Sequence, residues 1–213
     1  MSQKVQFKTA DGMNIVGDFY KSDKKTGLAA LLLHMMPATR SSWDHFAEQL
    51  AGTGISSLAI DLRGHGESQG GPEGFKSFTD QEHQASMKDV EAGIWWLRDA
   101  GFKKIVFAGA SIGANLALWR LAEGSDEEIK SAILLSPGLD YRGIKTEPLA
   151  QKLLPDKNIF IISEMAGDAQ KIYDLTRAKK QIKIIKERYH GTDILRAHPD
   201  IEKELMKWAA KNV

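Results

Sequence analysis

The residues with the clearest chemical potential are Gly109-Ala110-Ser111-Ile112-Gly113, where a glycine stands two positions away on each side of a serine. An apolar run, residues 105–108, precedes them, and a helix-compatible segment, residues 114–122, follows. Both glycines suit a strained strand-to-helix turn, because neighbouring chain passes too close to leave room for a Cβ. Such a turn lifts the serine oxygen clear of the backbone. The pattern therefore predicts a nucleophile at Ser111.

A serine hydroxyl becomes an effective nucleophile when a base takes its proton, and a carboxylate orients that base. Two histidines lie downstream of Ser111, namely His190 and His198. His190 follows an apolar run and precedes a glycine, so a short loop can turn its ring towards Ser111. His198 precedes Pro199 at an expected helix start, where we expect solvent exposure. We therefore assign His190 as the general base.

The carboxylate that would orient His190 has more than one candidate. Asp168 and Asp140 both lie in expected loops after apolar runs, in the chain order serine, acid, histidine. Asp168 follows Gly167 in the loop after the strand that precedes the histidine strand, whereas Asp140 lies one strand earlier and could instead brace the segment 139–156. Glu164 is a third candidate. We prefer Asp168 and keep Asp140 as the alternative.

These residues need elements to position them, and the hydrophobic pattern supplies a regular alternation. Residues 5–9 and 14–20 alternate apolar and polar around Asp11-Gly12, which predicts a β-hairpin. Apolar runs without alternation predict strands covered on both faces, and amphipathic segments between them predict helices. One long helix is expected over residues 79–100. The expected strands after the hairpin cover residues 28–33, 55–60, 105–110, 131–135, 158–162 and 182–185.

This alternation predicts an α/β fold with a mostly parallel central sheet of about eight strands, an N-terminal hairpin and helices on both faces. No internal repeat or boundary divides the chain, so residues 1–213 are expected to form a single domain. Ligands of such sheets bind beyond the carboxyl ends of the strands. His34, Asp61, Ser111, Asp168 and His190 all follow apolar runs and are expected at that edge.

Composition narrows the function classes. The formal net charge of the 213 residues is +1, which predicts no attraction to nucleic acid or to an acidic membrane. The chain has no cysteine, which excludes disulfides and thiolate chemistry. No apolar run reaches the roughly 18 residues of a membrane span, so a cytoplasmic location is expected. No metal-spaced ligand set or dinucleotide-binding glycine motif occurs, and we expect neither a metal nor another cofactor.

Three other histidines are expected to be structural or peripheral. His65 lies within a glycine-rich loop and is expected to be structural; the family resemblance described next implies that it braces this loop. His45 and His83 fall in helical segments and are expected at the surface.

Taken together, these motifs resemble the α/β-hydrolase family over nearly the full chain. The matching stretches are His34-Met35-Met36-Pro37, Asp61-Leu62-Arg63-Gly64-His65-Gly66-Glu67-Ser68, Gly109-Ala110-Ser111-Ile112-Gly113, Gly167-Asp168 and Tyr189-His190-Gly191-Thr192-Asp193. The chain looks like the compact serine-esterase, thioesterase and dienelactone-hydrolase-like branches. The resemblance implies Ser111 as nucleophile, His190 as base and Asp168 as acid.

The resemblance also implies an oxyanion hole built from two backbone N–H groups. One belongs to Ile112, directly after the nucleophile, and the other comes from the loop opened by His34, with Met36 preferred over Met35. The family usually has glycine after this histidine, and this chain has Met35. A bulky residue there could alter the loop or narrow the acyl pocket.

The implied function is cleavage of carboxylic esters or thioesters of small soluble acyl compounds, through an acyl-enzyme. The family's lid would have to fall within residues 139–156, which are too few for a multi-helix cap, so no substantial cap domain is expected. Two alternatives remain. One is a peptidase or amidase on the same triad, and the other is a ligand-binding module that uses the fold without catalysis.

Overall fold

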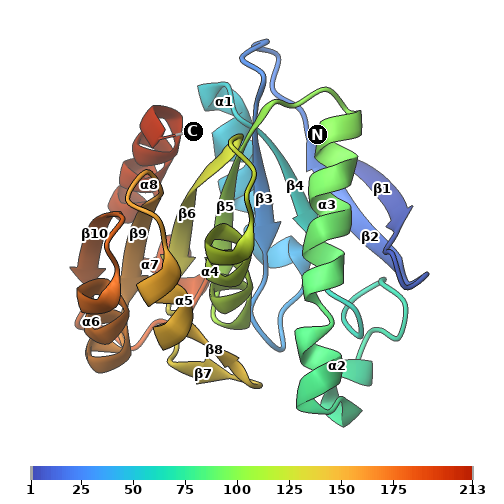
Figure 1. The fold of residues 1–213 in the computed structure, drawn as a ribbon. Coiled ribbons are helices and arrows are strands. Elements are labelled where there is room, and N and C mark those ends of the chain that lie inside the picture. The colour runs from blue at the N-terminus through green and yellow to red at the C-terminus, as the bar shows by residue number, and fades with distance from the viewer. Residues whose placement is uncertain (1, 213) are drawn as a thin grey trace.

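The computed structural model describes residues 2–212 and contains an eight-stranded sheet with helices on both faces (Figure 1). The strand order in the sheet is β1-β2-β4-β3-β5-β6-β9-β10. The fold class predicted from the sequence is therefore confirmed. The strands are β1 (Gln3–Lys8), β2 (Asn14–Tyr20), β3 (Leu28–Leu33), β4 (Ser56–Ile60), β5 (Lys104–Ala110), β6 (Ile129–Leu135), β9 (Asn158–Ser163) and β10 (Lys179–Ile184).

Pairing follows the sequence pattern. Strands β1 and β2 form the predicted hairpin, with Phe7 opposite Ile15, and β2 pairs antiparallel with β4. All pairs from β4 to β10 are parallel. The two edge strands, β1 and β10, are the most polar, and each carries lysines. The central strands β3 and β5 are almost wholly buried, as their continuous apolar runs predict.

Helices cover the two faces of the sheet in separate groups. Helices α3 (Met87–Asp99), α4 (Ile112–Glu123), α5 (Thr146–Lys152) and α6 (Ala166–Leu175) bury their apolar residues in one core cluster with the sheet. On the other face, α1 (Asp44–Thr53), α7 (Asp193–Ala197) and α8 (Pro199–Asn212) bury theirs in a second cluster. Short 3₁₀ segments occupy Arg40–Trp43 and Gly74–Ser77.

The prediction of one unbroken helix over residues 79–100 is wrong. The structure has two helices there, α2 (Asp80–Gln84) and α3. Between them, Ser86 N–H donates to His83 O and Asp89 N–H donates to Ser86 O, three residues back rather than four, which interrupts the helical repeat. His83 was expected at the surface, but its ring is buried edge-on against Phe78.

Residues 139–156 do not form a large cap. They form a two-stranded hairpin, β7 (Asp140–Tyr141) with β8 (Ile144–Lys145), followed by α5. The hairpin lies at the carboxyl-terminal edge of the sheet, beyond the end of β6 (Figure 1). This placement sets one wall of the site described next.

Candidate functional site

Ser111 lies at the turn between β5 and α4, as the glycine spacing predicts. Its backbone has φ of 53° and ψ of −119°, in a region that side-chain-bearing residues rarely adopt. A Cβ at Gly109 would overlap backbone atoms of Gly113 and Ala114. A Cβ at Gly113 would lie 2.7 Å from the carbonyl oxygen of His34 and closer still to that of Leu33. Both glycines are therefore required by close backbone approach.

The strained conformation of Ser111 is held by hydrogen bonds on both sides. Its N–H donates to Leu135 O of the neighbouring strand at 2.8 Å. Its carbonyl accepts from Ala114 N–H at 2.9 Å and from Asn115 N–H at 3.2 Å, in the first turn of α4. Backbone strain of this kind persists where the surroundings over-determine it, and it clusters at functional sites.

His190 is paired with Glu164 and not with Asp168. Its Nδ1 lies 2.6 Å from Glu164 Oε1, and the carboxylate is largely buried. With Nδ1–H donating to the carboxylate, Nε2 is the ring nitrogen left to accept a proton. The structure therefore gives His190 a different carboxylate partner from the predicted Asp168, namely Glu164, the third candidate of the sequence.

The reason lies in where β9 ends and α6 begins. The strand ends at Ser163, so Glu164 is the first residue past the edge of the sheet. Helix α6 starts at Ala166, and Asp168 therefore lies in its first turn, where Oδ2 accepts from Leu139 N–H at 3.2 Å. Asp140 does not reach His190 either, because its Oδ1 accepts from Gly143 N–H within the β7–β8 turn.

The His190 loop lies directly against the serine turn. A Cβ built on Gly191 would stand 3.3 Å from the Cβ of Ala110, the residue before the serine. Gly191 itself has φ of 56°, which favours glycine. The structure thus brings the predicted nucleophile and the predicted base to one edge of the sheet, together with Glu164.

Ser136, which the sequence analysis did not single out, sits between these groups. It follows β6, is fully buried, and has φ of 49°. Its hydroxyl donates to Glu164 Oε2 at 2.6 Å and accepts from Gly191 N–H at 2.9 Å. A serine directly before Pro137 at the end of a buried strand was the only signal available in the sequence.

Tyr141 of the β7–β8 hairpin covers the site. Its hydroxyl lies 3.4 Å from Ser136 O and 3.5 Å from Met165 Sδ, and its ring packs on Gly138. Burial raises the pKa of this phenol, and the nearby Ser111 hydroxyl opposes the rise. The phenol is therefore a neutral donor close to the nucleophile.

The hairpin is tied to the serine helix by Asn115, which is fully buried in α4. Its amide nitrogen donates to Gly138 O at 3.1 Å and to Ile144 O at 2.9 Å, and its carbonyl oxygen accepts from Gly138 N–H. The wall that carries Tyr141 is thereby fixed to the helix that begins at the nucleophile.

The predicted oxyanion donors Ile112 and Met36 lie at the start of α4 and in the loop after β3. Gly113 packs against the carbonyl groups of Leu33 and His34, so this loop lies beside the start of α4. Ile112 is the first residue of α4, and the first N–H groups of a helix have no partner within it. Met36 is half-buried in the loop, next to the same core cluster.

Met35 has a structural place that the sequence did not reveal. Its sulfur lies 2.5 Å from the position of a Cβ on Gly191 and 4.0 Å from Thr192 Oγ1. The side chain packs with the core on the α1 and α8 face. The Met35 side chain therefore packs against the His190 loop. A glycine at position 35 would leave this contact unmade.

His34 is buried and fixed by two hydrogen bonds. Its Nδ1 lies 2.8 Å from Met35 O, and its Nε2 accepts from Leu62 N–H at 3.0 Å. Burial lowers the pKa of this imidazole to about 3, so it is neutral. His34 therefore shapes the loop, joining it to the segment after β4.

The segment that follows β4 is a brace, as predicted for His65. The His65 ring is buried, stacks on Phe75 at 4.1 Å and bonds to Arg63 O through Nδ1. Asp61 is fully buried and accepts from Arg40 and from Glu67 N–H. The charges of Arg40, Asp61 and Glu67 thus compensate one another beside this segment.

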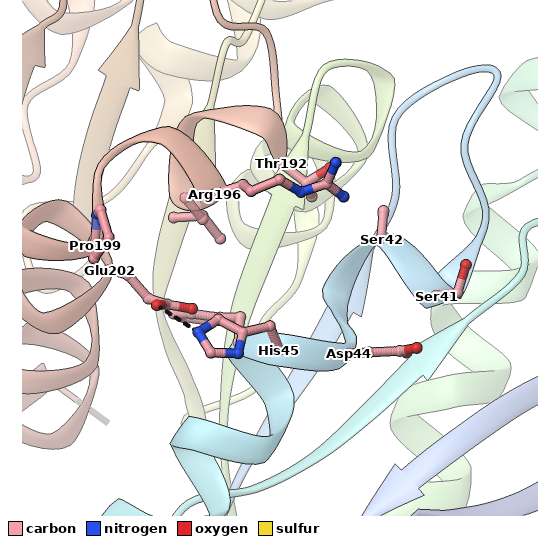
Figure 2. Close-up of a pocket in the computed structure, with 10 residues that line it drawn as sticks. Ser41, Ser42, Asp44, His45, Thr192, Arg196, Pro199 and Glu202 are labelled. Atoms are coloured by element: carbon pink, nitrogen blue, oxygen red, sulfur yellow. Dashed lines mark ion pairs between the residues drawn. The ribbon is translucent and has the colours of Figure 1, made fainter.

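A separate cavity of about 420 Å³ opens between α1 and the α7–α8 corner (Figure 2). His45, exposed as predicted, forms an ion pair with Glu202 across it at 3.3 Å. Thr192 lines this cavity, whereas Ser111, Glu164 and His190 do not. The cavity thus borders the His190 loop through Thr192 and is separate from the group formed by Ser111, His190 and Glu164.

Within residues 2–212, no group of three or more histidine, aspartate or glutamate side chains is arranged to hold a metal ion.

In the same part of the chain, no helix is both long enough and apolar enough to cross a membrane.

Comparison with known proteins places the chain in a family. The model of the alpha/beta hydrolase fold matches residues 31–193. Bifunctional epoxide hydrolase 2 of Sus scrofa is 29% identical over 111 residues, which are 52% of this chain and 19% of that protein. The AB hydrolase superfamily protein YisY of Bacillus subtilis is 26% identical over 110 residues, 52% of this chain and 38% of that protein. The chain thus spans well under half the length of these curated relatives.

Solved structures agree on the fold. The Pyrococcus furiosus esterase Pf2001 superposes with a TM-score of 0.78 at 18% identity, covering 100% of this chain and 91% of that one. The alpha/beta hydrolase GrgF from Penicillium sp. sh18 superposes with a TM-score of 0.81 at 14% identity, covering 100% and 99%. With the sheet order, the serine turn and the family match over most of its length, this chain belongs to the α/β-hydrolase family.

Proposed function

We propose that the protein is a serine hydrolase that cleaves carboxylic esters or thioesters with Ser111, His190 and Glu164. The observation that supports this most is the 2.6 Å contact between His190 Nδ1 and Glu164, at the edge of the sheet where Ser111 holds its strained turn. A binding module has no need of an oriented base beside such a serine. A carboxylate on Nδ1 fixes the tautomer in which Nε2 can accept a proton.

The mechanism follows from these groups. Ser111 Oγ attacks the acyl carbon while His190 Nε2 takes the hydroxyl proton, and the imidazolium formed is stabilised by Glu164. The tetrahedral intermediate collapses, the leaving alcohol or thiol receives the proton from His190, and Ser111 is left acylated. Water then attacks the acyl-enzyme with His190 again as base, which releases the acid and restores the serine.

The negative oxygen of each tetrahedral intermediate needs preorganised donors. In this proposal they are the backbone N–H groups of Ile112 and Met36. Ile112 begins α4, so the helix dipole adds to its effect. Loss of one such donor typically costs about 2.7–4 kcal/mol of transition-state stabilisation.

The substrate class in this proposal is small acyl compounds. The segment between β6 and β9 adds only the β7–β8 hairpin and α5, and no multi-helix cap covers the site in residues 2–212. Tyr141 and Met165 present a compact, mostly apolar wall near Ser111. A short acyl chain fits such a wall better than a long lipid chain.

The test uses a fluorophosphonate probe together with p-nitrophenyl acetate, butyrate and decanoate. We expect the wild type to be labelled and to prefer the short esters, and Ser111→Ala to lose both labelling and turnover. Matched thioesters and anilides distinguish ester, thioester and amide preference. A folded wild type that neither labels nor turns over any of these substrates would refute the proposal.

A further inference from the structure

Ser136 connects the acid side and the base side of the site through one hydroxyl group. Its Oγ lies 2.6 Å from Glu164 Oε2, while the other carboxylate oxygen, Oε1, holds His190 at 2.6 Å. The same Oγ lies 2.9 Å from the N–H of Gly191, the residue after the histidine. Carboxylate, hydroxyl and histidine loop therefore form a closed ring of contacts.

The directions of the two hydrogen bonds made by the Ser136 hydroxyl are fixed. The Gly191 N–H can only donate, so Ser136 Oγ accepts there and has its single proton left for Glu164. A hydrogen bond to an ionised carboxylate is short and strong compared with a neutral one. The hydroxyl thus fixes one oxygen of the carboxylate and orients the other, which faces His190.

The backbone of Ser136 is held in the conformation that makes this possible. Its φ of 49° is disfavoured for a residue with a side chain. The Ser136 N–H donates to Ile162 O at 2.8 Å, and its carbonyl lies 3.4 Å from the Tyr141 hydroxyl. Glycine would adopt this φ without strain but would supply no hydroxyl. The strained backbone is therefore the cost of placing the Ser136 hydroxyl at this position.

We infer that Ser136 is a positioning residue of the site: its hydroxyl holds the Glu164 carboxylate and the His190 loop in fixed relation, so that the imidazole faces Ser111. This inference rests on the proposed function for its kinetic consequence. Its structural consequence concerns the His190–Glu164 hydrogen bond and can be observed without any substrate.

The kinetic test compares Ser136→Ala, Ser136→Gly and the control Ser131→Ala. Ser131 is also buried in β6, but its hydroxyl has no partner. Both Ser136 variants should lose about 10- to 100-fold in kcat with little change in KM, as expected for a lost hydrogen bond to a charged group. Ser131→Ala should stay within about twofold of the wild type.

Ser136→Gly separates positioning from stability. It relieves the strained φ, so it should unfold at a higher denaturant concentration than Ser136→Ala while remaining equally slow. If Ser136→Gly has wild-type kcat, the hydroxyl has no positioning role and the inference is wrong. If Ser131→Ala is as slow as the Ser136 variants, the loss is a general effect of strand packing, which also overturns it.

The spectroscopic test follows the Nδ1 proton of His190 by NMR. In the wild type, a short hydrogen bond to Glu164 should give a downfield resonance, assigned by its absence in His190→Gln. In Ser136→Ala this resonance should move upfield or disappear through exchange, and in Ser131→Ala it should be unchanged. An unchanged resonance in Ser136→Ala refutes the positioning role. A wild type with this signal but no probe labelling would refute only the proposed hydrolase function.

Discussion

Glu164 and Asp168 lie four residues apart in the chain, and they have separate partners. Glu164 contacts His190 and the Ser136 hydroxyl, while Asp168 accepts a backbone N–H from the residue that leads into the β7–β8 hairpin. The first carboxylate lies against the proposed base, and the second holds a neighbouring loop. Replacing each acid by its amide should therefore change the activity by unequal amounts.

Glu164→Gln should lower kcat/KM by about 10³- to 10⁴-fold, because an amide at this position allows the wrong tautomer of His190. Asp168→Asn should keep activity within a few-fold, since its carbonyl oxygen can still accept from Leu139 N–H. Ester hydrolysis and the rate of fluorophosphonate labelling measure both. A larger loss for Asp168→Asn than for Glu164→Gln would reverse the assignment of the acid.

Sequence reasoning could place the serine and the histidine but could not choose the acid. Ser111 stands between two glycines, and backbone contacts leave no room for a Cβ at either glycine. The sequence shows this requirement directly, because only glycine lacks a Cβ. The choice between Glu164 and Asp168 depends on where β9 ends and α6 begins, and both residues suit either position. Ser136 was missed for a related reason, because a left-handed serine has no signature in the sequence.

At the scale of elements, the serine turn depends on how closely β3, β5 and α4 approach one another. Gly113 and Gly167 make a matched pair, since each is the second residue of its helix. A Cβ on Gly113 would meet the carbonyl oxygens that end β3, whereas a Cβ on Gly167 would have no atom within 4 Å. The same substitution thus probes contact at one site and helix propensity at the other.

Gly113→Ala should lower the free energy of unfolding by about 2–3 kcal/mol, because backbone must move to admit the methyl group. It should also slow probe labelling, since the turn carries Ser111. Gly167→Ala should be neutral or stabilising by up to about 1 kcal/mol. Urea unfolding measures both changes, and equal effects of the two substitutions would contradict the close-contact explanation.

The hydrophobic pattern predicted the strands well where the residues alternated strictly or formed a continuous apolar run. The β1–β2 hairpin and the buried strands β3 and β5 follow directly from alternation and from continuous apolar runs. The single helix over residues 79–100 was a wrong prediction because both halves suit a helix and neither glycine nor proline stands near the break at Ser86. The break depends on tertiary contacts of buried His83 and Asp89, which no local pattern records.

At the scale of the whole molecule, buried His34 links stability to pH. The folded protein lowers its pKa to about 3 from the ordinary value of 6.5, because the ring is fully buried and neutral. Between these values the unfolded chain binds a proton that the folded chain does not. The contribution of His34 is therefore complete above pH 6.5 and is lost as the pH falls towards 3.

At pH 4.5 this linkage should lower the free energy of unfolding by about 2–3 kcal/mol relative to pH 7.5. Urea unfolding of the wild type and of His34→Gln at both pH values measures this change. The difference between the two proteins is the part of the pH dependence that comes from His34. Because the variant loses a buried ring, NMR of the wild-type His34 ring protons gives a second measurement. A ring that titrates near pH 6.5 in the folded protein would contradict the prediction.

The two edges of the sheet carry a last consequence. An edge strand leaves a row of backbone groups unpaired, and a second sheet can add to it. Both edges here present lysines, at Lys4 and Lys8 on β1 and at Lys179, Lys180 and Lys183 on β10. Joining two such edges would place like charges side by side. The lysines on the two edge strands therefore disfavour strand pairing between the sheets of neighbouring molecules.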